Sequence, residues 1–230
     1  MKYENVTRAK FLSRPNRFIA KVEIEGKEET VHVKNTGRCK ELLVPNCTVF
    51  LEGSKNPERK TKYDLIAVEK KTDSGVMLIN MDSQVVNAAA AEWLPKSCLF
   101  SENAKFHREY THKDSRFDFY IEDGERKAFL EVKGVTLEVE GAALFPDAPT
   151  ERGIKHLKGL CEAIDEGYES YVLFVIQMKP ITHFSPNEKM HKAFADAMCE
   201  CRDRGVNIIA MDCNICEDSI EIDSPVKIIL

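Results

Sequence analysis

Two short apolar segments, 115–120 and 129–133, limit the folds that this chain can adopt, because they read as the two strands of one β-hairpin. They are separated by a turn sequence that contains Asp123-Gly124, and Asp-Gly between runs of aromatic and branched residues is a strong hairpin signal. Side chains alternate between the two faces of a strand, so Glu131 and Lys133 must share a face.

The position of the turn decides how Asp118 lies relative to Glu131. A tight turn at 124–125 puts Asp118 opposite Glu131, whereas a turn at 123–124 makes Asp118 its diagonal neighbour on the same face. Both registers group two carboxylates and one amine on a single patch of sheet. The alternative is a surface hairpin with a solvated Glu-Lys pair.

Clustered carboxylates are costly unless a cation joins them, because like charges destabilise a sheet and favour retention of a proton. A hard divalent cation such as Mg²⁺ takes oxygen ligands and commonly sits beside substrate phosphate. A lysine two residues from the second carboxylate can then orient water or stabilise negative charge in a transition state. The segment therefore predicts a magnesium site for phosphate chemistry.

Composition places the chain among soluble globular proteins of one large or two small domains, with 230 residues, 43% hydrophobic and 31% charged. No apolar run reaches membrane-spanning length, and the first residues do not lead into a signal-peptide core. Eight cysteines without a secretion signal predict reduced thiols and a cytoplasmic protein.

The net charge of −5 conceals an asymmetry along the chain. Residues 1–80 hold 16 Lys and Arg against 11 Asp and Glu, while the rest of the chain holds 17 against 27. A basic first part and an acidic, carboxylate-bearing second part suit a binding module joined to a metal-using module. A chance fluctuation between the two parts is the alternative.

The first part of the chain alternates in short strand-like pieces. Five strands are expected, at 18–24, 29–33, 44–51, 63–69 and 76–80, with one turn of helix at 37–43. Five short strands in about 80 residues suit a small closed barrel of the OB type. We therefore predict an OB-like nucleic-acid-binding barrel over residues 1–82.

The pattern of apolar and helix-favouring residues changes after Asn80. Residues 83–230 are predicted to form a mixed-sheet α/β domain, so the predicted fold class of the whole chain is α/β (α+β). The expected elements are a helix at 85–94 that Pro95 stops, a strand at 105–110, the hairpin, a helix that Thr150 caps, a buried strand at 171–176, a helix at 187–204 and a strand at 206–211. A hairpin with Asp and Glu-x-Lys, then a helix, then a buried strand is the order of the PD-(D/E)xK nuclease core.

The sequence also resembles, over nearly its whole length, the sugar fermentation stimulation protein A (SfsA) family. The segments that carry the resemblance are 32–38 (HVKNTGR), 57–63 (PERKTKY), 115–119 (SRFDF), 130–137 (LEVKGVTL) and 143–157 (ALFPDAPTERGIKHL). Cys39 stands where methionine is expected and Asn46 where glycine is expected, and neither change touches a charged group. The family name describes a sugar-fermentation phenotype and does not state a reaction.

The resemblance implies an N-terminal OB-like barrel, a C-terminal PD-(D/E)xK domain, and DNA binding without strong sequence preference. Carried onto this chain, it makes Asp118 and Glu131 ligands of Mg²⁺ or Mn²⁺, with the carbonyl of Val132 as a third ligand, and Lys133 the catalytic lysine. It implies nuclease architecture more firmly than nuclease activity.

The helix that follows Thr150 holds further candidates. Glu151 and Lys155 lie four residues apart on one edge of its apolar stripe, and related folds use this helix to aim a residue into the site, so both are predicted catalytic residues. A simple i,i+4 ion pair is the alternative. His156 borders the other edge and is a weaker candidate.

Candidate nucleic-acid contacts fall in both parts of the chain. Asn35, Thr36 and Arg38 surround a turn glycine and could grip a phosphate backbone, or the polar side chains could bond their own backbone. Arg59, Lys60 and Lys62 belong to a basic loop that could follow a strand electrostatically, or could be merely solvated. Arg116 could contact phosphate. The predicted partner is DNA, with RNA as a second candidate, and a dimer is compatible with the sequence.

The cysteines of Cys199-x-Cys201 and Cys213-x-x-Cys216 depart from the spacing of common zinc sites, so ordinary thiols are expected there. The leading hypothesis is a DNA-binding protein with a Mg²⁺-dependent phosphodiesterase site. The alternative is a DNA-binding or regulatory protein that affects sugar (maltose) metabolism on a nuclease scaffold without turnover.

Overall fold

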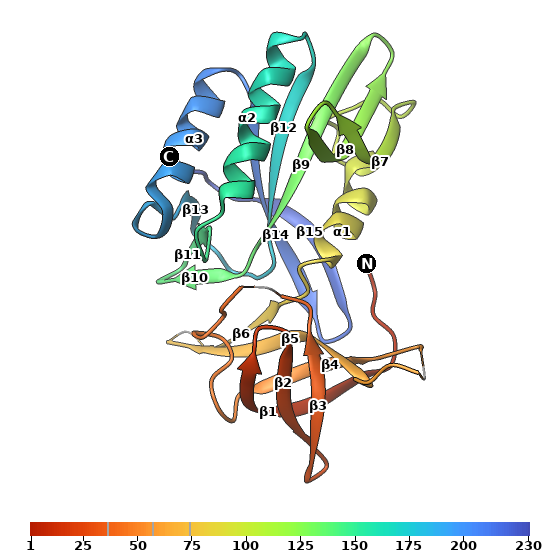
Figure 1. Cartoon of the computed structure of the whole chain (residues 1–230), viewed down its shortest axis with the longest axis vertical. Coiled ribbons are helices and arrows are strands. Elements are labelled where there is room, and N and C mark those ends of the chain that lie inside the picture. The colour runs from red at the N-terminus through yellow and green to blue at the C-terminus, as the bar shows by residue number, and fades with distance from the viewer. Residues whose placement is uncertain (36, 57, 74) are drawn as a thin grey trace.

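The computed structural model describes residues 1–35, 37–56, 58–73 and 75–230, which form two domains (Figure 1). The N-terminal sheet has the strand order β3-β2-β1-β4-β5-β6, and β3 also pairs with β5. Its strands are β1 (Val6–Asn16), β2 (Ile19–Ile24), β3 (Lys27–Val33), β4 (Thr48–Gly53), β5 (Tyr63–Thr72) and β6 (Gly75–Asn80).

The pairing of β3 with β5 closes a ring of five strands, β1-β2-β3-β5-β4, and this ring confirms the predicted OB-like barrel. The β3–β5 contact is parallel and short, at His32 opposite Asp64 and Val33 opposite Leu65. The sixth strand, β6, lies outside the ring and pairs with the far end of β5.

The predicted membership of the barrel was wrong in one strand, because β1 was missed. The exposed face of β1 carries charged residues, and Pro15 lies near its end. Because proline within a sheet is confined to edge strands, strand starts and bulges, this segment was not predicted as a strand. Only Ala9 and Phe11 of β1 are buried. The single helical turn predicted at 37–43 corresponds to a hydrogen-bonded turn in which the N–H groups of Leu42 and Leu43 both donate to the Cys39 carbonyl.

The C-terminal domain is built on a mixed sheet of order β15-β14-β12-β9-β8-β7, with β9, β12 and β14 parallel. Helices α2 and α3 cover one face of this sheet and α1 lies on the other (Figure 1). A second, three-stranded sheet has the order β10-β11-β13. Among the described helices, none is long and apolar enough to span a membrane.

The predicted C-terminal elements occur in the expected order. Four further strands were not predicted: β10, β11, β13 and β15. The elements are α1 (Val85–Trp93), a 3-10 helix (Leu94–Lys96), β7 (Lys105–His112), β8 (Ser115–Asp123), β9 (Arg126–Val135), β10 (Leu137–Val139), β11 (Ala142–Phe145), α2 (Glu151–Asp165), β12 (Glu169–Ile176), β13 (His183–Pro186), α3 (Glu188–Asp203), β14 (Asn207–Cys216) and β15 (Ser219–Pro225).

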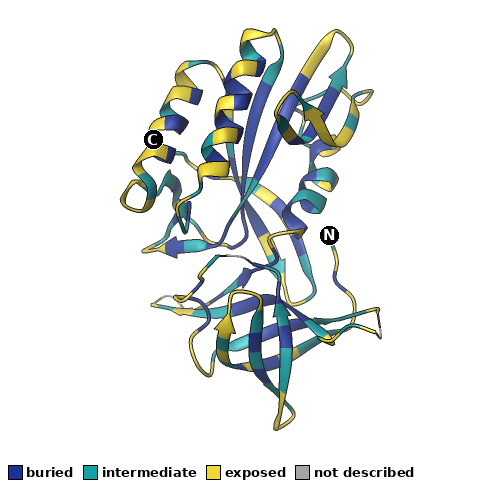
Figure 2. Ribbon diagram, in the orientation of Figure 1, coloured by how far each residue is buried: buried dark blue, intermediate teal, exposed yellow. Residues whose placement is uncertain are grey.

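The central strands of this domain are buried along most of their length (Figure 2). Val172, Phe174 and Ile176 of β12 pack in the cluster that includes α2 and α3, whereas Leu173 and Val175 pack in the cluster that includes α1. The central strands are therefore buried on both faces, as their nearly continuous apolar sequence predicted.

Polar contacts join the two domains. The Gln177 amide of the C-terminal domain donates to Asn80 Oδ1 at 2.9 Å and to the Asp82 carbonyl at 3.0 Å. Within the N-terminal part of the chain, Asn80 donates to the Tyr3 hydroxyl at 2.9 Å. The predicted boundary between residues 82 and 83 falls between β6 and α1. The first residues of the chain lie against the C-terminal domain, where Lys2 forms an isolated antiparallel β-bridge with Ser219.

Candidate active site

The hairpin of β8 and β9 turns at residues 124–125, since Asp123 pairs with Arg126 and Phe119 with Leu130. This register, continued one residue beyond the last strand pair, sets Asp118 opposite Glu131, so the turn position of the first predicted register is confirmed. Phe129 packs in the cluster that faces α2, and alternation places Glu131 on that same face.

Glu131 is held by two donors that reach the same oxygen. Its side chain is only 3% exposed, the Lys133 ammonium lies 2.5 Å from Oε1, and Nδ1 of His156 on α2 also bonds Oε1. Burial raises the pKa of Glu131, but the His156 hydrogen bond and the Lys133 charge outweigh it, and the pKa lies below its usual value. Glu131 is therefore ionised at neutral pH.

Both carboxylate oxygens of Asp118 accept hydrogen bonds. Oδ1 accepts from the Asn87 amide of α1 at 2.6 Å, and Oδ2 accepts from the Val132 backbone N–H at 2.7 Å. Burial, together with the nearby charge of Glu131, nevertheless raises the pKa of Asp118 above its usual value. The two carboxylates thus repel each other in the absence of a cation.

The chemistry of the Asp118 and Glu131 carboxylates fits a divalent cation. Oε2 of Glu131 is buried and has no hydrogen-bond partner in the described part of the chain, although buried carboxylate oxygens are normally satisfied. The described residues contain no group of three His, Cys, Asp or Glu side chains that could hold a metal. Two carboxylates completed by backbone, water and phosphate oxygens are a ligand set typical of Mg²⁺.

A cavity of about 460 Å³ opens beside Asp118. Three arginines from three elements line it: Arg108 of β7, Arg116 of β8 and Arg152 of α2. Glu109 also lines the cavity and is ion-paired with Arg116. The cavity therefore combines a carboxylate with several donors suited to bidentate contacts with phosphate.

Thr150 caps α2 as predicted, because its side-chain oxygen accepts from the Gly153 N–H at 3.0 Å. The cap satisfies a backbone N–H in the first turn of the helix. Glu151 lies at the exposed start of α2, with its side chain 86% exposed and 3.3 Å from His191.

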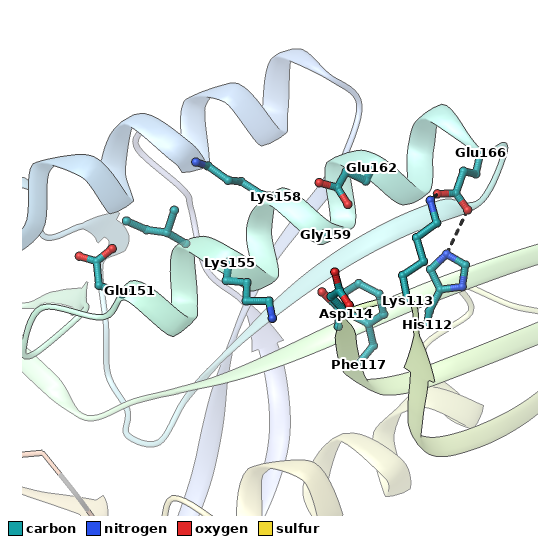
Figure 3. A pocket seen from close by; sticks show the side chains of 12 residues that line it. His112, Lys113, Asp114, Phe117, Glu151, Lys155, Lys158, Gly159, Glu162 and Glu166 are labelled. Carbon is teal, nitrogen blue, oxygen red and sulfur yellow. Dashed lines mark hydrogen bonds and ion pairs between the residues drawn. The ribbon is translucent and has the colours of Figure 1, made fainter.

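Lys155 lies one turn beyond Glu151, and both line a cavity of about 380 Å³ between α2 and the β7–β8 turn (Figure 3). The structure thus brings Asp118, Glu131 and Lys133 together, and it puts His156, not Glu151 or Lys155, in contact with Glu131. The catalytic roles of Glu151 and Lys155 stay predictions.

Asn35 forms the turn that was the alternative to a phosphate grip, because its Oδ1 accepts from the Gly37 N–H at 2.7 Å. Arg14 fixes the same loop by donating to the carbonyls of Asn35 at 2.8 Å and Arg38 at 2.6 Å. The Arg38 side chain is exposed. Thr36 lies outside the described residues.

Arg59 is engaged in the barrel, where its guanidinium makes two hydrogen bonds to Asp64, of 2.9 and 2.7 Å. Asp64 also bonds Nδ1 of His32 at 2.9 Å. This pairing competes with the predicted contact of Arg59 with nucleic acid. Lys60 and Lys62 are exposed and remain available to a partner.

Sequence reasoning missed several residues around the site, notably Asn87, Arg108 and Arg152, and it gave His156 little weight. The spacing of Arg152 and His156 is i,i+4 on one helix, a signal that could have identified them as a pair. Asn87 had no such signal, because its contact with Asp118 depends on the packing of α1 against the sheet. The Sγ atoms of Cys161 on α2 and Cys201 on α3 lie 3.4 Å apart.

Comparison with known proteins agrees with this division of the chain. Residues 12–79 match the family model described as the SfsA N-terminal OB domain. Residues 84–219 match the model described as the sugar fermentation stimulation protein RE domain, a restriction-endonuclease-like domain.

Relatives cover nearly the whole chain. A sugar fermentation stimulation protein homolog of Desulfitobacterium hafniense (strain Y51) is 61% identical over 96% of this chain and 95% of its own length. A homolog from Clostridium beijerinckii is 55% identical over 100% of both chains. The solved structure of Pyrococcus furiosus SfsA in complex with Ca²⁺ matches with a TM-score of 0.86 at 24% identity, over 100% of this chain and 98% of that one. The chain therefore belongs to the sugar fermentation stimulation protein (SfsA) family.

Proposed function

We propose that this protein binds DNA without strong sequence preference and hydrolyses phosphodiester bonds with Mg²⁺ or Mn²⁺ at Asp118 and Glu131. The observation that carries the proposal is Oε2 of Glu131, which is buried and has no hydrogen-bond partner among the described residues, beside a second carboxylate and the Lys133 ammonium. A packed surface hairpin would not leave a carboxylate oxygen buried and unbonded.

Asp118, Glu131 and the Val132 carbonyl would hold the cation. The Val132 N–H points toward Asp118, and the N–H and C=O of one strand residue face the same neighbour, which supports the carbonyl as a ligand. The Pyrococcus furiosus relative of the same fold was solved with Ca²⁺. When bound, the cation supplies charge stabilisation at phosphate and lowers the pKa of water.

The other residues have separate roles. The Lys133 ammonium stabilises negative charge that develops on the phosphate and orients the attacking water. Asn87 holds Asp118 in place through its 2.6 Å hydrogen bond. The arginines that line the adjoining cavity, Arg108, Arg116 and Arg152, bind phosphates of the substrate.

A run of adjoining cavities supports a path for the nucleic acid from the barrel to the site. Arg17 lines both a basic cavity with Arg38 on the barrel and a cavity between the domains. Ser83 lines that interdomain cavity and also the arginine-lined cavity at Asp118. Phe117 lines both the arginine-lined cavity at Asp118 and the cavity that Lys155 lines (Figure 3).

The test is cleavage of single- and double-stranded DNA and of RNA by the pure protein with Mg²⁺, Mn²⁺ or a chelator. Asp118→Asn is a suitable control because Asn can still accept from the Val132 N–H, while Asn87 can reverse its amide to bond the new NH₂. Removing a direct ligand should lower the rate by more than the roughly 10- to 100-fold typical of outer-shell residues.

The outcomes separate the two hypotheses. Metal-dependent cleavage that Asp118→Asn abolishes supports the nuclease, and the preferred substrate then distinguishes DNA from RNA. Cleavage that persists undiminished in Asp118→Asn comes from a contaminant. DNA binding without any cleavage by the wild type would instead support the non-catalytic regulatory protein.

A further inference from the structure

His156 connects the candidate active site to Arg152 by two hydrogen bonds. Its ring is buried between α2 and the sheet, Nδ1 contacts Oε1 of Glu131, and Nε2 lies 3.4 Å from Nε of Arg152. An arginine Nε–H can only donate, so Nε2 of His156 must accept. The proton of the imidazole therefore lies on Nδ1 and is donated to Glu131.

The two donors on Glu131 reach the same oxygen. Both His156 Nδ1 and Lys133 Nζ bond Oε1, while Oε2 is buried without a partner in the described structure. The His156 ring is anchored on α2, a rigid element whose first turn is fixed by Thr150. A lysine ammonium ends a four-carbon stem with three rotatable donors, so Lys133 by itself could follow either oxygen as the carboxylate turns.

We propose that His156, held in one tautomer by Arg152, is a positioning residue that turns Oε2 of Glu131 toward the divalent cation. This inference rests on the proposed metal site. It adds that a hydrogen bond from His156 sets the orientation of the Glu131 carboxylate, one of the ligands. A hydrogen bond that fixes the orientation of a carboxylate ligand reduces the reorganisation required when a cation binds.

A purely structural role for His156 would be to fill the space between α2 and β9. Two substitutions separate the roles: His156→Asn keeps an N–H donor near the position of Nδ1, whereas His156→Leu fills the space without a donor. Arg152→Met removes the group that fixes the tautomer and leaves the ring in place. His183→Asn, on β13, is the matched control for the chemical change.

The first measurement is the affinity for Mn²⁺ alone, by calorimetry, with thermal unfolding in chelator to establish that each variant is folded. His156→Leu should weaken Mn²⁺ binding by about 10- to 100-fold, and His156→Asn should recover most of that loss. Arg152→Met should cause a smaller loss, and His183→Asn none. The second measurement is the ¹⁵N NMR spectrum of the His156 ring, which should report the Nδ1–H tautomer in the wild type and a mixture in Arg152→Met.

Equal Mn²⁺ affinity in wild type and His156→Leu would overturn the positioning role while leaving the metal site intact. Equal weakening in His156→Leu and His156→Asn, or an Nε2–H tautomer in the wild type, would also overturn it. Failure of the wild type to bind Mn²⁺ would remove the metal site itself, and the NMR result would then show whether the hydrogen-bonded chain exists without it. If His156→Leu does not fold, His156→Asn and Arg152→Met still decide the question.

Discussion

Oδ2 of Asp118 accepts a hydrogen bond from the backbone N–H of Val132 at 2.7 Å. The regular pairing of β8 with β9 ends just before this point, at Phe119 and Leu130. The side chain of one strand therefore satisfies the main chain of the other where the two strands diverge. The candidate site forms in that divergence, and the sheet itself supplies both carboxylates.

Asp118→Asn should raise the stability of the metal-free protein at neutral pH. Burial and the charge of Glu131 raise the pKa of Asp118, so its ionised form is less favourable in the folded chain than in the unfolded chain. Asp118→Ala should instead destabilise by about 1–3 kcal/mol, because it leaves the Val132 N–H unpaired. Urea unfolding in chelator measures both, and a less stable Asn variant would contradict the repulsion.

Lys133→Met should leave Mn²⁺ affinity unchanged or increase it, because it deletes a positive charge 2.5 Å from Oε1 of Glu131. Cleavage should fall by about 100-fold or more, since the ammonium acts on charge that develops in the transition state. Calorimetry and cleavage rates on the same preparation test this separation. Lys127→Met, exposed on the same strand, is the matched control, and weaker Mn²⁺ binding by Lys133→Met would refute the assigned role.

The hairpin, the cap at Thr150 and the buried strand β12 could be predicted because each depends on residues close in sequence. The Asp-Gly turn, the alternation of strand side chains and an apolar run are local signals. β1 was missed although exposed Arg8 and Lys10 alternate with buried Ala9 and Phe11, and although a two-residue turn joins β1 to β2. Only its pairing with β4, from Val6 opposite Glu52 to Lys10 opposite Thr48, was beyond a local interpretation. Strand pairs so far apart in sequence have no local signature.

The same distinction applies to the site. Asp118, Glu131 and Lys133 come from one hairpin, so a register argument could group them. Whether Glu151, Lys155 or His156 faces Glu131 depends on the rotation of α2 on the sheet, which is set by packing of residues such as Leu157 and Leu160. The helical period alone left these three residues open, and the contact of His156 with Glu131 emerged only from the assembled layers.

The barrel should lose stability in acid through Asp64. Burial raises the pKa of Asp64, but hydrogen bonds from Arg59 and His32 outweigh it and lower the pKa to about 2. A carboxyl with a lowered pKa stabilises the fold above its unfolded pKa and loses this contribution as the pH falls through the folded value. The contribution of about 2 kcal/mol should therefore disappear between about pH 4 and about pH 2.

The free energy of unfolding in urea, measured against pH for wild type and Asp64→Asn, tests this expectation. The difference between the two should shrink over that acidic window and stay constant near neutrality. Asp218→Asn, at a half-exposed pair with Lys2, is the control for an ordinary surface carboxylate. A difference that does not change with pH would show that Asp64 contributes through packing and not through its charge.

Gly37→Ala should disturb the packing of Gly37 against Asp147 of the C-terminal domain. A Cβ at this position would lie 2.0 Å from Oδ2 of Asp147 and 2.9 Å from Oδ1 of Asn35. Such overpacking typically costs about 1–3 kcal/mol. Asp147→Ala should partly rescue Gly37→Ala, because it removes the closest atom. Additive losses of stability in the double variant would show that the clash is relieved by another movement.

Arg38→Ala and neutralisation of Lys60 and Lys62 should weaken DNA binding on all sequences alike, if the barrel supplies the electrostatic grip. The plot of log affinity against log salt should flatten by about 0.9 for each phosphate of duplex DNA that the variant no longer neutralises. Arg59 is omitted because its guanidinium is engaged with Asp64. Lys27→Ala, exposed at the β2–β3 turn, is the matched control for removal of one surface charge.

Asp118→Asn should behave in the opposite way in metal-free buffer, because removing a negative charge beside the phosphate path leaves affinity unchanged or raises it. Arg108→Ala and Arg152→Ala should flatten the salt dependence as the barrel variants do, since both residues line the cavity at Asp118. If only these two variants change the slope, DNA contacts the C-terminal domain alone. In that case the positive surplus of residues 1–80 is a solvated surface, and the barrel has some other partner.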